Sequence, residues 1–242
     1  MQINPKTWIR YIRGGEKRHQ QFFNNFSIAC INGEPDPNDA IRKGALEIHN
    51  EIRKNLIKKT LLQDNGDPFP GTKSMFKLTY DCALEGLAMT TFSGCQSKPK
   101  MDYIPAGKSL NYAIERKVAS LPADAAIADM IKAAAEEWAE TRFDGVIDEK
   151  TVVYDNEDLG PFANMIYHKT MTVGCGTMYC SDKKRLAVAC LYDAKPELGQ
   201  PLYTPVKTDK GCEDNNKPCT KAVKGATCIP GTDPNYPGLC KI

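Results

Sequence analysis

The residues with the clearest chemical potential are ten cysteines, which are spread from residue 30 to residue 240. An even number of cysteines in a chain of this size is typical of a disulfide framework made in an oxidising compartment. Zinc binding is the competing interpretation, but no Cys-x-x-Cys pair occurs and the three histidines are scattered. We therefore expect disulfide bonds from all ten, which are Cys30, Cys82, Cys95, Cys175, Cys180, Cys190, Cys212, Cys219, Cys228 and Cys240.

Common catalytic motifs do not occur in this sequence. Gly-x-Ser-x-Gly, Walker A, His-Glu-x-x-His and Gly-x-Gly-x-x-Gly patterns are all absent from it. A cysteine nucleophile is disfavoured because all ten cysteines can pair. We therefore expect no enzymatic activity, no catalytic residue and no cofactor.

Composition narrows the class of protein further. The 242 residues carry a formal net charge of only +2, whereas a general nucleic-acid-binding protein shows a clear basic excess. No stretch approaches the roughly 18 apolar residues of a membrane span. Asn25 begins the only Asn-x-Ser/Thr sequon and is the candidate glycosylation site. Together with the cysteines, these features indicate a secreted, extracellular protein.

Residues 1–29 form a basic N-terminal extension without cysteine. Asn4 could cap a short helix that has Pro5 in its first turn and Gly14 just past its end. One interpretation is an arm that binds a membrane surface or a partner. The simpler interpretation, which we adopt, is an extension that packs on the main domain or forms a loose tail.

Apolar periodicity predicts four helices after residue 36. The first is capped within residues 36–39 and carries one apolar stripe, formed by Ile41, Ala45, Ile48, Ile52 and Leu56. The second covers about 80–94, the third begins near Pro122 and carries Trp138, and a shorter one is expected at about 158–169. The intervening residues 95–121 are expected to be looser.

Two strands and a tail complete the prediction. Residues 170–180 and 185–192 form a hairpin around a polar turn. Cys175 and Cys180 should point to opposite faces of this hairpin and bond to different partners. Helices followed by antiparallel strands indicate an α+β fold. Residues 201–242 hold four cysteines and six prolines but few large apolar residues, so two disulfides must order them. We expect a main domain at 30–200 and a separable Cys-rich, hinge-like tail at 201–242.

Six segments then carry a family resemblance. Residues 46–53 contain the pattern His49-Asn50-x-x-Arg53, and five further segments follow in order, at 78–85, 160–167, 173–176, 189–192 and 238–240. Their order and the cysteine placement resemble the CAP superfamily (SCP/TAPS), in particular the nematode activation-associated secreted proteins and venom allergen-like proteins. The resemblance covers residues 30–242.

The resemblance implies a fold and a disulfide pattern. The fold is a three-layer α-β-α sandwich with an antiparallel sheet, followed by a small C-terminal Cys-rich hinge. The implied bridges are Cys30–Cys82, Cys95–Cys180, Cys175–Cys190, Cys212–Cys228 and Cys219–Cys240.

Many members of this family carry a divalent-metal cleft with two histidines and two glutamates. By the resemblance, this chain keeps only Glu140 of the four. Lys108 stands at the position of the other glutamate, Pro161 stands at that of one histidine, and no histidine lies between His49 and His168 to supply the other. His168 is about 10 Å along a helix from Pro161, too far to substitute. We therefore expect no metal site, and we expect His49 to be a buried structural residue.

Without a catalytic set, binding is the remaining activity. The lead hypothesis, which the resemblance carries, is a secreted effector that binds a host protein and modulates immunity or haemostasis. Hookworm inhibitory relatives look similar at 162–164 and 199–203. The alternative is a carrier of a sterol or fatty acid between the helix at 41–56 and the helix near Asp158, although these apolar faces would equally serve to fill a core.

Overall fold

The computed structural model describes residues 26–27, 30–31, 34–35, 39–213 and 215–242. The expected helix after Asn4 and the glycosylation site Asn25 lie outside the described residues. No helix in the described part combines the length and apolar character needed to cross a bilayer.

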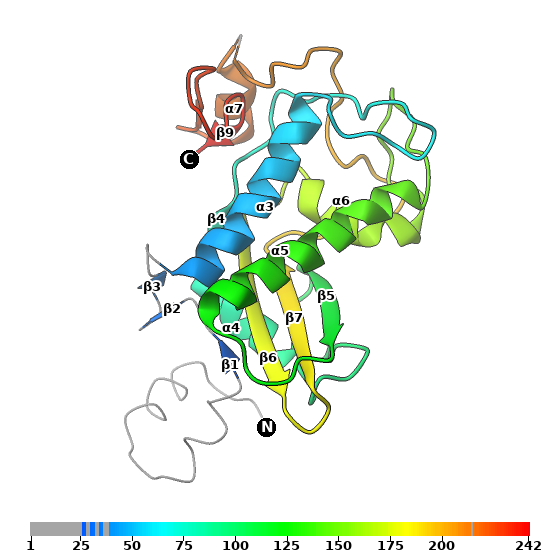
Figure 1. Cartoon of the computed structure of the whole chain (residues 1–242). Helices are drawn as coiled ribbons and strands as arrows, with labels where there is room; N and C mark the ends of the chain where they lie inside the picture. The colour runs from blue at the N-terminus through cyan, green and yellow to red at the C-terminus, as the bar shows by residue number, and fades with distance from the viewer. Residues whose placement is uncertain (1–25, 28–29, 32–33, 36–38, 214) are drawn as a thin grey trace.

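A mixed sheet forms the centre of the molecule (Figure 1). Its strands lie in the order β1 (Phe26–Ser27), β6 (Thr172–Cys180), β7 (Arg185–Tyr192) and β5 (Ser109–Arg116), and the short β4 (Thr79–Tyr80) pairs in parallel with β6. The predicted hairpin is confirmed as β6 and β7, which pair antiparallel with Cys175 opposite Cys190. Two small antiparallel ladders join β2 (Cys30–Ile31) to β3 (Glu34–Pro35) and β8 (Thr227–Cys228) to β9 (Cys240–Lys241).

Helices cover both faces of this sheet and make a three-layer α-β-α sandwich (Figure 1). α4 (Cys82–Thr90) packs on one face, and α3 (Ala40–Ile57), α5 (Asp124–Glu140) and α6 (Gly160–Ile166) pack on the other. Short 3-10 helices at Thr141–Phe143 and Glu157–Leu159 and the helix α7 (Lys217–Ala222) complete the elements. The predicted α+β class and sandwich are confirmed.

Alternation along the hairpin sorts its side chains between the two layers. Val188 and Cys190 join the large core with α3 and α5, whereas Ala189 and Leu191 pack against α4. Gly174 lies where α4 approaches β6 most closely. A Cβ atom at Gly174 would overlap the Glu85 nitrogen, so this position requires glycine.

Three predicted boundaries are wrong. Residues 95–121 contain the eight-residue strand β5, which pairs along its whole length with β7. α4 ends at Thr90 instead of 94, and the left-handed backbone of Gly94 and Cys95 (φ 60° and 50°) does not fit a right-handed helix. α6 ends at Ile166 instead of 169, because Tyr167 takes an extended conformation.

The five disulfides are the pairs that the resemblance implies. Three lie in the sandwich, as Cys30–Cys82, Cys95–Cys180 and Cys175–Cys190, and two lie in the tail, as Cys212–Cys228 and Cys219–Cys240. Cys175 packs in the core under α3, whereas Cys180 packs with Cys95 on the side of α4. The two cysteines therefore serve opposite faces, as their spacing predicts.

The C-terminal tail packs directly against the sandwich. Leu202 and Tyr203 are fully buried in the large core, and the Tyr203 hydroxyl donates to the Pro70 carbonyl at 2.9 Å. Further along, the Cys240 nitrogen donates to the Met75 carbonyl at 2.8 Å. A division between 30–200 and 201–242 stays a prediction, and these contacts cross it.

Candidate functional site

The conspicuous polar residues of α3 face inward. His49 is fully buried; its Nδ1 lies 2.7 Å from the Ala45 carbonyl and its Nε2 lies 2.8 Å from the Tyr192 hydroxyl. Since a carbonyl only accepts, Nδ1 carries the proton and Nε2 accepts from Tyr192. Burial lowers the pKa of His49 to about 4, so the ring is neutral at physiological pH. The ring has the buried, hydrogen-bonded environment expected of a structural histidine.

A hydrogen-bonded chain continues from Tyr192 across the sheet to α6. The amide of Asn111 on β5 donates to the Tyr192 oxygen at 3.0 Å and to the Pro161 carbonyl at 2.9 Å. Its Oδ1 accepts from Asn164 at 2.8 Å. Burial raises the pKa of Tyr192, so the hydroxyl keeps its proton. The network thus joins α3, β7, β5 and α6 with each buried polar group partnered.

Arg53 is the second buried side chain of α3 that hydrogen-bonds to distant parts of the chain. Its guanidinium is fully buried and donates to four backbone carbonyls, those of Phe76, Met165, Tyr167 and Thr170, at 2.7–3.1 Å. Two of these carbonyls belong to the C-terminal end of α6, which has no helical partners for them. Burial lowers the pKa of Arg53 to about 9, which leaves it charged at neutral pH. Its role in the structure is therefore to terminate α6 and hold three segments together.

The residues at the cleft positions that the resemblance implies offer few donors to a metal ion. Pro161 lies in the first turn of α6 and offers only a carbonyl, which Asn111 already uses. Lys108 is a cation just before β5, and Glu140 is the exposed last residue of α5. Across the described residues, the one group of three or more clustered His, Cys, Asp or Glu ligands is Cys212, Cys219 and Cys228, whose sulfurs are in disulfides. These donors do not fit a divalent cation.

His168 has a structural partner of its own. Its Nδ1 lies 2.7 Å from the Leu202 carbonyl, and the Leu202 carbonyl also accepts from the His168 backbone nitrogen at 3.0 Å. Burial lowers the pKa of His168. The side chain therefore anchors the start of the tail. Sequence reasoning missed Asn111, and it placed Asn164 and Tyr192 only within segments that carry the family resemblance, because no local pattern shows which residues meet across the sheet.

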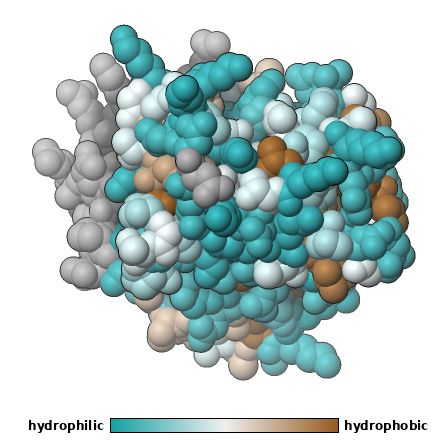
Figure 2. Space-filling view, turned by 90° about the horizontal axis from the view of Figure 1, so that it is seen from above, coloured by the Kyte–Doolittle hydropathy of each residue, from teal (hydrophilic) through white to brown (hydrophobic). Residues whose placement is uncertain are grey.

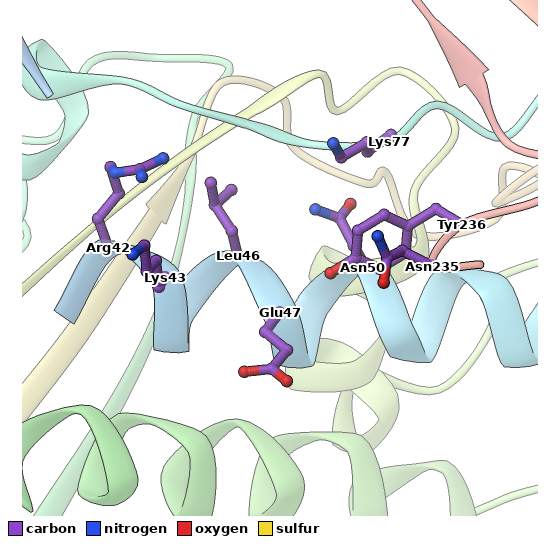
Figure 3. Close-up of a pocket in the computed structure, with 8 residues that line it drawn as sticks. All are labelled: Arg42, Lys43, Leu46, Glu47, Asn50, Lys77, Asn235 and Tyr236. Carbon is purple, nitrogen blue, oxygen red and sulfur yellow. The ribbon is translucent and has the colours of Figure 1, made fainter. Parts of the chain in front are cut away.

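One pocket lies between α3 and the tail. It encloses about 460 Å³ and is lined by Arg42, Lys43, Leu46, Glu47, Asn50, Lys77, Asn235 and Tyr236 (Figure 3). Glu47 points toward α5, where it pairs with Lys132 at 2.7 Å, and the Lys77 ammonium lies 5.1 Å from the centre of the Tyr236 ring. Cations and amides dominate this lining, which does not suit an acyl chain or a sterol.

Exposed apolar side chains gather beside Arg142. Leu62, Phe143 and Val146, the Phe143 patch, are each between 41% and 49% exposed. Arg142 joins two of them, since its Nε donates to the Leu62 carbonyl at 3.2 Å and its guanidinium lies 4.0 Å from the centre of the Phe143 ring. Ile147, next to Val146, donates its backbone nitrogen to the Gln63 side chain at 2.7 Å. By contrast, the face in Figure 2 is mostly hydrophilic, with scattered apolar spots.

Comparisons with known proteins agree with this architecture. The model of the cysteine-rich secretory protein family (CAP) matches residues 46–192. Ancylostoma secreted protein from Ancylostoma caninum is 26% identical over 199 residues, which are 76% of this chain and 43% of that protein. The chain therefore spans less than half the length of this curated relative.

Two solved structures share the fold. BmVAL-1 has a TM-score of 0.69 at 21% identity, and the match covers 88% of this chain and 98% of that chain. NaASP2, solved with Zn²⁺, has a TM-score of 0.64 at 20% identity, and the match covers 88% of this chain and all of that chain.

Proposed function

The chain belongs to the cysteine-rich secretory protein (CAP) family, and we propose that it is a secreted, non-enzymatic effector that binds a protein of a host organism and so modulates immunity or haemostasis. The observation that carries this proposal is the use of the family's cleft for packing. Pro161 occupies a ligand position there, and its carbonyl is consumed by Asn111, within a network that leaves no free donor set. A cleft of this kind supports folding and leaves the surface to do the binding.

Secretion is supported by two features. Five disulfides staple the described part of the chain, and such bonds persist in oxidising environments. The curated relative from Ancylostoma caninum is itself named a secreted protein. A glycan on Asn25 would be consistent with the same route.

A protein partner is favoured over a lipid by the character of the surfaces. The apolar faces of α3 and α6, the walls proposed for a lipid carrier, are filled; Ile41, Leu56, Phe162 and Ile166 are almost completely buried in one core. The Phe143 patch instead places an aromatic ring, two aliphatic side chains and a fixed arginine on the surface. Aromatic and arginine side chains are the residues most enriched at binding hot spots.

We test the proposal by capture from host plasma and leukocyte extracts. The immobilised protein is compared with Leu62→Ser/Phe143→Ser and with the matched control Met101→Ser/Tyr103→Ser, which removes two other exposed apolar side chains. We expect one partner to be captured by the parent and the control but not by the patch variant. A partner that all three proteins retain would exclude the Phe143 patch as its binding surface.

Two side measurements examine the alternatives. Organic extraction of the purified protein should release no stoichiometric lipid, whereas a one-to-one yield would favour the carrier. Zinc titration by calorimetry should show no tight site; a submicromolar one-to-one isotherm that is lost in Glu140→Ala would restore the metal cleft.

A further inference from the structure

One end of the sheet is strongly basic, and we infer that it binds a sulfated polysaccharide. This basic end consists of three segments, at 94–100, 115–118 and 181–186. They contain two carboxylates, Glu115 and Asp182, against seven cations, which are Lys98, Lys100, Arg116, Lys117, Lys183, Lys184 and Arg185. The three segments thus carry a net charge of +5, although the whole chain carries only +2.

The fold brings these three segments together. The Cys95–Cys180 disulfide ties the loop after α4 to the end of β6, and the Lys183 ammonium donates to the Gly94 carbonyl at 2.5 Å. Arg116 and Arg185 are direct cross-strand neighbours at the ends of β5 and β7. Figure 1 shows the turn between β6 and β7 and the end of β5 at the same lower end of the sheet. These contacts hold the three segments near one another at one end of the sheet.

The charges and backbone conformations of the basic end disfavour folding. Like charges that lie directly opposite each other on neighbouring strands repel, as Arg116 and Arg185 do. Lys117 and Lys184 also have left-handed backbone conformations, with φ of 68° and 49°, which favour glycine over lysine. Lysine at both positions therefore opposes folding and adds charge to the basic end.

Among the described residues, no ion pair joins a carboxylate to the cations of the basic end. In the described ranges, the ion pairs are Lys54–Glu51, Lys58–Glu213 and Lys132–Glu47, all of which lie on or beside α3. Lys117, Lys184 and Arg116 are exposed. Exposed cations that lower the stability of the fold are well placed to bind the anionic groups of another molecule.

The shape and the compartment select the kind of anion. The cations are distributed over three adjacent segments, which suits an extended polymer with repeated charges better than a single phosphate. Anionic lipids are concentrated on the cytoplasmic side of membranes. A secreted protein would instead meet sulfated polysaccharides, and this choice of polymer rests on the extracellular location proposed above.

The left-handed lysines allow a test in which loss of binding cannot be attributed to misfolding. Lys117→Gly/Lys184→Gly removes two cations and places glycine where the backbone favours it, so the variant should melt at or above the temperature of the parent. The matched control is Lys59→Gly, which also replaces a lysine of positive φ (57°) but lies just beyond the C-terminal end of α3, away from the sheet end.

Binding to a heparin oligosaccharide is measured by calorimetry at several salt concentrations. We expect the double glycine variant to bind about tenfold more weakly, because each exposed ionic contact contributes a factor of roughly three. Its affinity should also depend less steeply on salt, since fewer counterions are released. Lys59→Gly should bind within about twofold of the parent.

Several outcomes would overturn the inference. They are unchanged affinity in the double glycine variant, an equal loss in Lys59→Gly, and equal binding of desulfated heparin. Tighter binding of phosphatidylserine vesicles or duplex DNA than of heparin would assign the surface to another polyanion. Purified components are used throughout, so failure here would leave the capture experiment on the Phe143 patch unaffected.

Discussion

The sandwich and the C-terminal tail keep their structures by different means. In the sandwich, buried apolar faces of four helices meet one sheet, and the large polar side chains His49, Asn111 and Arg53 among them are hydrogen-bonded. The tail from Cys212 onward contributes only Ile229 and Leu239 to the buried residues of the large core, and its own small cluster packs half-cystines around Phe76 of the sandwich. Two disulfides and a series of backbone hydrogen bonds also hold it.

Buried polar groups and exposed charged groups have different roles in this molecule. His49, Asn50 and Arg53 form the most recognisable pattern of the sequence, yet each is fully buried and hydrogen-bonded within the fold. Buried polar groups that are fully partnered specify a fold, whereas removal of one partner is strongly destabilising. The exposed cations Arg116, Lys117 and Lys184 at the end of the sheet, which form no ion pair with any other described residue, show the opposite condition, which is suited to binding.

The largest loss of stability is expected from Arg53→Met, which removes hydrogen bonds inside the sandwich. Four buried carbonyls lose this donor, while the Tyr167 carbonyl still accepts from the Thr170 nitrogen at 3.1 Å. Each of the three other carbonyls costs about 1–3 kcal/mol when it is unsatisfied, so the free energy of unfolding should fall by about 3–9 kcal/mol. Urea denaturation measures the loss. Lys54→Met on the same helix should cost about 0.5 kcal/mol or less. Similar losses in the two variants would contradict a structural role for Arg53.

The second prediction locates the boundary between the two regions. A chain that ends at Gln200 loses Leu202 and Tyr203, whereas one that ends at Lys207 keeps both in the core. Burial of two such side chains contributes about 4 kcal/mol, so the longer chain should be more stable by that amount. Thermal melts of the two truncations decide the point. Equal melting temperatures would support a boundary at residue 200.

The third prediction concerns a variant that destabilises only the tail. Cys219→Ser/Cys240→Ser removes a bridge that closes a loop of 21 residues and should cost about 3 kcal/mol. Hydrogen exchange should increase around Phe76 and Cys240, while the amides of β6 and β7 keep their protection. If protection fell equally in β6 and β7, the two regions would unfold as one unit.

The smallest expected effect is the loss of stability at acidic pH that comes from His49. Because burial lowers the pKa of His49 from an ordinary value near 6.5 to about 4, the unfolded chain binds a proton on His49 before the folded chain does. Its contribution to stability is present above pH 6.5 and is lost as the pH falls toward 4, by about 2 kcal/mol between pH 7 and pH 5. His49→Gln should flatten the dependence of stability on pH in this range, and His168→Gln should leave most of it. An unchanged slope in His49→Gln would refute the assignment.

Local patterns in the sequence determined much of the framework. The even set of cysteines predicts disulfides, and the odd spacing of Cys175 and Cys180 separates their partners, as observed. The stripe from Ile41 to Leu56 predicts α3, since helical periodicity places these residues on one buried face. The alternation of Leu110, Tyr112 and Ile114, which pack toward the α4 side, could have revealed β5 as well.

Tertiary structure alone decided which distant groups meet. Arg53 ends α6 through carbonyls more than 100 residues away, and Asn111 reaches Tyr192 81 residues later in the chain. The like-charged pair Arg116 and Arg185 likewise exists only because β5 lies beside β7. Periodicity shows which face of an element is buried, but the partner on that face is fixed by how the elements pack, because hydrogen bonds and charges act over a few ångströms in space and not along the sequence.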